Sequence, residues 1–470
     1  MGAFLKKARR TLIGSRAFYA TVLSILVPMV IQNGITNFVS LLDNLMVGAL
    51  GDAEMSGVAI ANQLVFVFNL CIFGGLAGAG IYGAQFCGAG DMKGLRDTFR
   101  IKIMMSFVLL AVAFAVFIGF GDQLIAMFLK GDGDQAMAES MLHWAKKYLM
   151  IMLVGMPAFA LSQSYAGTLR ETGDTRLPMI ASVSAVATNA VFNYVLIFGK
   201  FGFPRLGVAG AAWATVLSRY VELTVIVVLV HKNSDKNAFI RGAYRTMRVP
   251  KHLLRDVLKV GAPLLANEAL WSIGMSTLTA IYSLSGLTVV SALSITSTIS
   301  NLFNVVFLSM GNAVSVMVGQ ALGADDYKGA KATVWKLIFF SVCTCFVMGT
   351  LLIVSSPYIP RLYSGVTQAV RDMASSMLVL SACAMPLHAF AHCSYFTLRS
   401  GGKTVITFLF DSGYTWVISV PVALLLVKVI AAPILWTYGT VQMMDVLKCV
   451  LGFILLRKGV WIQNIAKKHA

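Results

Sequence analysis

The sequence predicts an all-α membrane protein with twelve transmembrane helices in two six-helix lobes, related by a pseudo-two-fold axis along the membrane normal. Three observations support this fold class: an apolar composition, twelve long apolar windows and an internal repeat. Of the 470 residues, 58% are hydrophobic and 12% are charged, and the mean hydropathy is +0.78. Soluble domains carry about 25% charged residues, so the composition is that of a protein embedded in lipid.

Windows of about 20 apolar residues, long enough for a helix to cross roughly 30 Å of hydrocarbon, occur six times in each half of the chain. The expected helices lie near residues 18–43, 53–80, 98–120, 141–168, 177–199 and 207–231, then 258–283, 288–317, 333–356, 375–398, 404–427 and 437–458. These windows lack the period-two alternation of barrel strands. Helices are therefore the expected way to satisfy the backbone inside lipid.

An internal repeat relates the two halves. The order Gln, Gly, Ala, Asp, Lys, Gly occurs between Gln85 and Gly94 and again, 235 positions later, between Gln320 and Gly329. The same offset carries Pro28 onto Pro263. Six spans is an even number, so both copies enter the membrane from one side, which predicts two parallel lobes with a cleft between them.

The net charge is +18, and the basic residues that produce it lie mainly in the predicted loops. Basic residues gather before the first span, between the two halves and at the C-terminus, and this bias places both termini in the cytoplasm of a cell that inserts the chain into its inner membrane. We expect an N-terminal lobe at 1–231, a cytoplasmic basic linker at 232–257, and a C-terminal lobe with a cytoplasmic tail at 258–470. Because membrane topology accounts for the charge, no nucleic-acid partner is expected.

Motifs for enzyme chemistry are weak. His388 and His392 have the spacing of a metal pair, but no third ligand of matching spacing accompanies them. Gly78 to Gly83 reads G-x-G-x-x-G, yet it follows no strand and lies in an apolar window, where glycines favour close helix packing. We therefore expect that the protein is not an enzyme and binds no metal or cofactor. We expect it to carry out transport, with H⁺ or Na⁺ as the coupling ion.

Polar residues within the first lobe suggest a cation site. An ionisable group in mid-bilayer costs about 2.5 to 3.5 kcal/mol on insertion scales, so each is a functional candidate. Asp43 lies near the end of the first span, Asn189 and Asn193 share one face of the fifth, and Thr215 lies in the sixth. A carboxylate beside amide and hydroxyl oxygens suits a hard monovalent cation. The alternatives are a headgroup aspartate and plain interhelical hydrogen bonds.

The second lobe supplies candidates for substrate binding. Glu268 lies in the seventh span five residues after Pro263 and is the repeat partner of Asn33. Asp411 lies in the eleventh span without a basic residue one turn away, and His388 follows Pro386 in the tenth. We expect Glu268, His388, Asp411 and Asn33 to bind a cationic substrate, the alternative being hydrogen-bonded structural groups.

Two further pairs of opposite charge have i,i+3 spacing. Arg219 with Glu222 and Asp445 with Lys448 can each neutralise one another on their own helix. We therefore interpret these four residues as structural.

The ordered motifs resemble a known family. Pro28 and the segment from Asp43 (DNLMVGALG) are followed by Gln85 to Gly94, LRETGDTRLP at 169–178, NYVLIFG at 193–199 and LGVAGAAWAT at 206–215. Together they resemble the bacterial multidrug and toxic compound extrusion (MATE) transporters over nearly the whole chain. The resemblance implies a twelve-helix, two-lobed exporter that exchanges cytoplasmic organic cations for external Na⁺ or H⁺.

The resemblance also implies residue roles. Asp43 matches the family's first-span carboxylate, Asn189 and Asn193 its fifth-span polar pair, and Thr215 its sixth-span threonine. Some members have aspartate where this chain has Asn193. The family's seventh-span glutamate lies eight residues after the proline.

In this chain Trp271 occupies the position eight residues after Pro263, and Glu268 lies about one turn earlier. His388 stands where many members have a tenth-span carboxylate, and Asp411 is positioned to compensate for it.

The sequence-based prediction is a cation-coupled antiporter that exports lipophilic organic cations by alternating access, as a monomer in the bilayer. A lipid-linked precursor flippase of a related fold is the alternative. It would favour a cationic cleft for a pyrophosphate, whereas the spans carry carboxylates. A membrane-embedded enzyme would need a nucleophile with a base or a full metal set, and neither emerges.

Overall fold

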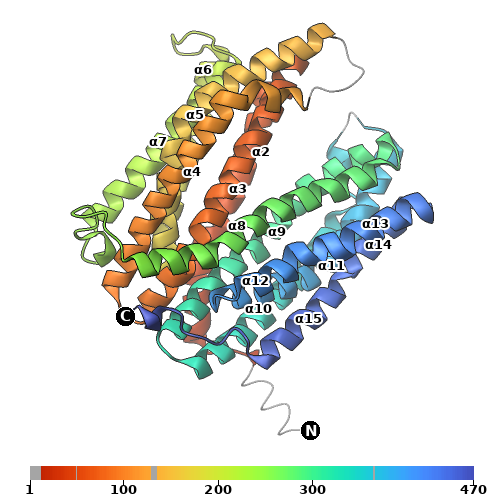
Figure 1. Cartoon of the computed structure of the whole chain (residues 1–470). Helices are drawn as coiled ribbons and strands as arrows, with labels where there is room; N and C mark the ends of the chain where they lie inside the picture. The colour runs from red at the N-terminus through yellow and green to blue at the C-terminus, as the bar shows by residue number, and fades with distance from the viewer. Residues whose placement is uncertain (1–11, 49, 129–134, 364–365, 470) are drawn as a thin grey trace. The chain divides into compact units, whose positions relative to one another are not determined.

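The computed structural model describes residues 12–48, 50–128, 135–363 and 366–469, and they are almost entirely helical (Figure 1). The first half contains α2 (Arg16–Gly48), α3 (Asp52–Gly88), α4 (Met92–Ala126), α5 (Gln135–Glu171), α6 (Arg176–Phe198), α7 (Val208–Lys232) and the 3₁₀ turn η1 (Ala238–Ile240).

The second half contains α8 (Lys251–Ser283), α9 (Leu287–Gly323), α10 (Tyr327–Ser355), η2 (Ile359–Leu362), α11 (Gln368–Ser400), α12 (Thr404–Phe408), α13 (Val420–Leu424), α14 (Ile434–Met443), α15 (Asp445–Lys458) and η6 (Ala466–Lys468). Two π-helical segments, η3 (Leu409–Gly413) and η4 (Thr415–Ser419), join α12 to α13, and a third, η5 (Leu425–Val429), follows α13. π turns within helices often mark functional positions, and the first of these contains Asp411.

Eleven helical stretches in the described residues are long and apolar enough to cross a membrane. They match eleven of the twelve predicted spans. The twelfth, α8, occupies the predicted seventh span but is not among them. Its first turns carry Lys251, Arg255 and Lys259 and its middle carries Asn267 and Glu268, which lower its hydropathy.

The chain divides into two compact units. The N-terminal unit consists of Val27–Gly83 and Asp91–Leu265, and the C-terminal unit consists of the described part of Met1–Leu26, Ala84–Gly90 and Ala266–Ala470. The helices α2, α3 and α8 each contribute to both units. Each unit is described below by itself.

In the N-terminal unit α4, α5, α6 and α7 pack side by side (Figure 1). Small residues allow close approach: a Cβ on Gly210 of α7 would lie 2.5 Å from the Leu196 carbonyl of α6. Between α4 and α5 the Ser106 and Ser164 hydroxyls lie 3.0 Å apart. Interhelical hydrogen bonds and small residues are the usual means of helix association in lipid.

The glycines of the G-x-G-x-x-G segment serve helix packing, as the sequence analysis predicted. A Cβ on Gly78 would lie 2.7 Å from the backbone of Gly261, and one on Gly80 or Gly83 would reach the Glu171 carboxylate. That carboxylate is paired with the fully buried Lys102, whose Nζ lies 2.5 Å from an oxygen of Glu171. The motif therefore makes room for a helix crossing and a buried ion pair.

The basic segment after α7 is docked on α4. Arg100 donates to the carbonyl oxygens of Ala243 and Gly242 at 2.8 and 2.9 Å, and Phe239 is fully buried with its ring 5.3 Å from that of Phe99. Part of the predicted linker is thus held against the N-terminal unit by hydrogen bonds and buried aromatic surface.

In the C-terminal unit α11 lies at the centre and packs against α9, α10, α14 and α15. The end of α3 crosses α9 at the two copies of the repeated motif. A Cβ on Gly88 would lie 1.9 Å from the Gln320 carbonyl oxygen, and one on Gly323 would lie 1.9 Å from that of Gln85. Equivalent residues of the repeat thus contact each other reciprocally, and glycine is required at both.

Candidate functional site

The first candidate site surrounds Asp43 in the N-terminal unit. Asp43 lies on α2 and is half-buried, while Asn189 and Asn193 on α6 are buried. The Asn193 amide donates to Asp43 Oδ1 at 2.5 Å. Asn189 satisfies its neighbours when its amide nitrogen faces Asp43, 2.9 and 3.1 Å from the two carboxylate oxygens. The structure therefore brings together three of the residues that the sequence predicted.

Thr215 completes this cluster from α7. In the same orientation the Asn189 side-chain oxygen accepts from Thr215 Oγ1 at 3.3 Å. Tyr148 of α5 is buried and hydrogen-bonds Thr215 and Asn62. Three helices, α5, α6 and α7, thus surround the carboxylate of α2 with neutral polar groups, and α3 contributes Asn62.

One oxygen in the cluster has no partner. Within the described chain, Asn193 Oδ1 is buried and forms no hydrogen bond. A buried acceptor without a donor has lost its hydrogen bonds to water and gained none from the protein. This costs about 1 to 3 kcal/mol unless a proton or cation interacts with the oxygen. The position beside Asp43 therefore has an oxygen available to a positively charged guest.

Arg219 is the nearest fixed cation recorded for this cluster, and it acts on Asp43 through its charge rather than a direct contact. Its Nη1 lies 3.1 Å from Glu222 Oε2, which is the intrahelical pair that the sequence predicted. The guanidinium also lies over the Phe159 ring, 5.1 Å from the centroid. Arg219 is thus paired with Glu222 rather than with Asp43.

The second candidate site is a cavity of about 890 Å³ in the C-terminal unit. Its walls come from α8, α9, α10, α11, the π segments η3 and η4, α14 and α15, and they include Glu268, His388 and Asp411. Aromatic side chains line it as well: Trp271, Tyr282, Phe307, Tyr395, Phe396, Tyr414 and Tyr438. A cavity of this size with a mostly apolar lining and a few charges suits a drug-sized molecule.

Asp411 has an ion-pair partner that the sequence did not indicate. Lys448 Nζ of α15 lies 2.6 Å from Asp411 Oδ1, and the Asn267 amide donates to Asp411 Oδ2 at 3.2 Å. Asn267 is itself held by Ser412, whose hydroxyl donates to Asn267 Oδ1 at 2.7 Å. The absence of a basic residue one turn away along the helix did not predict this neighbour, because it comes from another helix.

The expected local pairing of Asp445 with Lys448 is replaced by two contacts between helices. Lys448 contacts Asp411, while Asp445 Oδ2 lies 3.3 Å from His388 Nε2. The reason is geometric: residues facing a cavity meet charges from the opposite wall, which a spacing rule for one helix does not consider. His392 packs its ring against Phe396, with centroids 4.8 Å apart.

Glu268 differs from the other two cavity carboxylates. In the described residues it has no ion pair and no hydrogen bond through its side chain, although it lies within electrostatic range of Arg399 and Asp411. Asn33, its repeat partner, lies on α2 in the N-terminal unit, and its predicted part in substrate binding stays a prediction.

Comparison with known proteins shows where this arrangement belongs. The MatE family model matches residues 28–195 and 263–425, two segments that begin at the repeated prolines. The chain belongs to the MatE family. It is therefore a member of a family of transporters rather than enzymes, and the family resemblance seen in its motifs is confirmed.

Sequence relatives and solved structures agree with this family membership. The chain is 27% identical over 402 residues to the probable multidrug resistance protein YoeA of Bacillus subtilis (strain 168), with 85% of each chain covered. It is 23% identical over 410 residues to the probable multidrug resistance protein NorM of Thermotoga maritima, covering 87% of this chain and 85% of that one.

A solved structure described as the outward-facing conformation of a multidrug resistance MATE family transporter of the MOP superfamily superposes with a TM-score of 0.83. The sequences are 20% identical, and the match covers 96% of this chain and 97% of that one. The predicted fold class, an all-α membrane protein of the two-lobed MATE type, is confirmed by this match.

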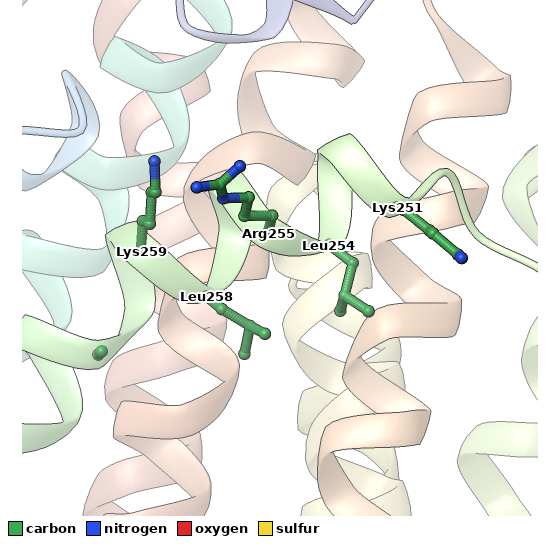
Figure 2. A pocket seen from close by; sticks show the side chains of 6 residues that line it. Lys251, Leu254, Arg255, Leu258 and Lys259 are labelled. Atoms are coloured by element: carbon green, nitrogen blue, oxygen red, sulfur yellow. The ribbon is translucent and has the colours of Figure 1, made fainter.

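A third feature is an open depression of about 500 Å³ on the first turns of α8 in this MatE protein. Lys251, Arg255 and Lys259 recur every four residues there, and Figure 2 shows Arg255 and Lys259 projecting to the side of the helix opposite Leu254 and Leu258. It contains none of the predicted site residues.

Sequence reasoning missed several residues that hold the two sites. Tyr148, Asn62 and Asn267 lie within the predicted spans, each next to another polar residue, and Lys448 was assigned to a local pair. Polar residues inside spans were the available signal. Their partners were not predictable, because each lies on a helix distant in the sequence.

Proposed function

We propose that this MatE protein is a cation-coupled antiporter that exports lipophilic organic cations from the cytoplasm across the cell's inner membrane, with H⁺ or Na⁺ entering in exchange. Both termini lie in the cytoplasm in this proposal. One observation carries it: a sequestered carboxylate, Asp43, surrounded by neutral amides and hydroxyls beside an unpartnered oxygen of Asn193. No residue neutralises this carboxylate by direct contact in the described chain, so a mobile cation can.

The coupling ion binds at Asp43, with Asn189, Asn193 and Thr215 as its neighbours. A proton would sit on the carboxylate and be stabilised by an acceptor such as Asn193 Oδ1. Sodium would be coordinated by oxygens of the carboxylate, the amides and the hydroxyl, which are the hard ligands that such ions prefer. The same residues therefore serve either ion, and transport measurements decide between them.

The substrate binds in the cavity of the C-terminal unit. Its aromatic walls provide apolar contact and π faces for a cation, and Glu268 provides negative charge. Multidrug resistance proteins are among the relatives of this chain, which supports this substrate class. Ion and substrate are exchanged when they prefer opposite-facing states of the protein, since coupling requires a difference in affinity between states.

Charge balance determines which part of the ion gradient does work. If one monovalent cation enters for each monovalent substrate that leaves, no net charge crosses the membrane. The roughly 2.3 kcal/mol per 100 mV of membrane potential then contributes nothing. The concentration gradient of the ion alone drives the cycle.

The flippase alternative fits the cavity less well. A lipid-linked pyrophosphate would meet Glu268, Asp411 and Asp445, with Lys448 as the lining's lysine among the described residues. Carboxylates repel a phosphate unless enough cations outnumber them. The lining charge favours a cationic substrate.

The test is Asp43→Asn in proteoliposomes that contain ethidium and an imposed Na⁺ or H⁺ gradient. This substitution keeps the size of the side chain and removes its charge, so we expect insertion and folding to persist and ion-driven efflux to be lost. The matched control is Asp122→Asn, because Asp122 is half-exposed and pairs with Lys146 away from the cluster. Efflux at the wild-type rate from Asp43→Asn would refute the proposal.

A further inference from the structure

The C-terminal cavity contains a cation site that the chain fills with its own side chain. Lys448 Nζ lies 2.6 Å from Asp411 Oδ1. It also lies over two rings, 5.5 Å from the centroid of Phe410 and 5.7 Å from that of Tyr414. A carboxylate with aromatic faces within about 6 Å is the composition of a binding site for an organic cation.

Neighbouring residues hold the carboxylate and one of the two rings of this site in place. Phe410, Asp411 and Tyr414 follow one another through the π segment η3 and its end, so the carboxylate and both rings come from one short stretch of backbone. Asn267 fixes the second oxygen of Asp411, and the Tyr414 hydroxyl donates to the Met444 carbonyl at 2.6 Å. Side chains held in this way lose little further freedom when a cation binds.

Lys448 is confined to this position. The exposed fraction of its side chain is 13%, and that of Asp411 is 17%. An ion pair this sheltered is costly to break, because the remaining charge loses its partner without regaining full hydration. A substrate ammonium would have to displace Lys448 and leave it unpaired, so Asp411 is closed to substrates.

Glu268 is then the cavity carboxylate that no basic side chain contacts directly among the described residues. Asp411 is paired with Lys448, and Asp445 contacts the His388 ring, which is charged only when it is protonated, whereas Glu268 has no ion pair in the described part of the chain and only feels the charge of Arg399 at longer range. A substrate with one positive charge can pair with Glu268. A second positive charge in the same cavity would meet Lys448.

We propose that Lys448 is a resident cation that limits the substrates of this transporter to organic cations with one positive charge. The inference rests on the proposed function and identifies the residue that decides substrate charge. Lys448 acts by occupying Asp411 and by repelling a second charge. Without it, Asp411, Phe410 and Tyr414 would form a second cation site beside Glu268.

The experiment measures binding of two probes of nearly equal size to the purified full-length protein by equilibrium dialysis. N-methyl-4-phenylpyridinium carries one charge, and N,N′-dimethyl-4,4′-bipyridinium carries two. We expect the wild-type protein to bind the first about tenfold or more tightly than the second, since like charges in one site are strongly unfavourable. In Lys448→Met the dication should gain about tenfold or more relative to the monocation.

Two controls isolate the charge of Lys448. Lys428→Met removes an exposed lysine outside the cavity lining and should leave the probe ratio at its wild-type value. The double variant Lys448→Met with Asp411→Asn removes the pair together, restores the charge balance of the cavity, and should return the ratio toward that of the wild type. Lys448→Arg keeps the charge and should keep the preference for the monocation.

The outcomes separate the two proposals. Binding of both probes by the wild type with equal affinity, or tighter binding of the dication, would overturn the role of Lys448 and leave the exporter proposal standing. If the wild type binds neither probe and moves no organic cation, the proposed function itself fails, and this inference with it. The wild-type ratio alone tests the inference even if Lys448→Met does not fold.

Discussion

Asp43 and Asp411 are both aspartates within long apolar helices, yet their surroundings differ in kind. Asp43 faces the amides of Asn189 and Asn193, whereas Asp411 faces the ammonium of Lys448. Neutral donors orient a carboxylate and leave its charge uncompensated, while a lysine compensates it permanently. We infer that the first arrangement is open to a mobile cation and the second is not, so the partner of each carboxylate decides the difference between them.

The most direct way to break this comparison is to give Asp43 the partner that Asp411 has. Asn193→Lys should place an ammonium beside Asp43, and we expect ion-driven ethidium efflux to be lost, because the fixed charge takes the place of the coupling ion. Proteoliposome transport under imposed Na⁺ and H⁺ gradients measures this. Asn233→Lys, at an exposed position after α7, is the matched control and should transport normally.

Retention of ion-coupled efflux by Asn193→Lys would show that the neutral surroundings of Asp43 are not what leaves it open to ions. The distinction drawn between the two aspartates would then be wrong, whatever the role of Lys448 proves to be.

A second test asks whether a paired carboxylate in the membrane is structural. Glu171 and Lys102 form such a pair inside the N-terminal unit, and Lys102 is 1% exposed. Lys102→Met leaves a buried charge unpaired and should lower the free energy of unfolding by about 3 to 5 kcal/mol. Thermal unfolding in detergent measures the loss.

The double variant Lys102→Met with Glu171→Gln removes both charges and should recover most of that stability. If the single variant is as stable as the wild type, or if the double variant is no better than the single one, the pair is not a structural unit. In contrast, Asp43→Asn should change stability little, because no ion pair is lost.

A third test concerns the part of the molecule where the two halves are alike. Gly88 packs against Gln320 of the second copy of the motif, and Gly323 packs against Gln85 of the first. A Cβ at either glycine would lie 1.9 Å from the carbonyl oxygen of the opposing glutamine. Gly88→Ala and Gly323→Ala should therefore destabilise by similar amounts, about 1 to 3 kcal/mol, as overpacked sites do. Gly119→Ala is the control, since nothing lies within 4 Å of a Cβ there.

Unequal losses at the two positions, measured by the same unfolding assay, would contradict the reciprocity of the crossing. Equal losses would show that the halves share a structural core while their binding residues diverge.

The sequence predicted the repeat, the helical spans and the i,i+4 amide pair because each depends on patterns along one chain: spacing and composition. The grouping of that pair with Asp43 and Thr215, which lie on other helices, was implied by the family resemblance. It did not predict the partners of Asp411 and Asp445. Those contacts join α8, α11, α15 and the π segment, and only the packing of helices decides which residues meet.

The smallest expected effect concerns a charge outside the membrane. Asp325, in the turn between α9 and α10, accepts hydrogen bonds from Asn464 and Lys467 of the C-terminal tail, both at 3.0 Å. These contacts lower the pKa of Asp325 to about 2, the Asn464 hydrogen bond being the largest cause. A lowered pKa in the folded state stabilises the tail contact above the unfolded pKa, and this contribution is lost as the pH falls through about 2.

Because Asp325 is solvent-exposed, salt and water screen its charge, and we expect no change in tail docking between pH 5 and 8. Hydrogen exchange of residues 461–469 measures this, with Asp325→Asn as the variant and Asp326→Ala, which removes the N-cap of α10, as a comparison outside the tail. Loss of tail protection between pH 8 and 5 would show that another group controls the contact. Asp325 completes the comparison of the aspartates: in water it gains little from its partners, and Asp411 is held by Lys448. We propose that Asp43, which no basic side chain contacts among the described residues, binds the coupling ion.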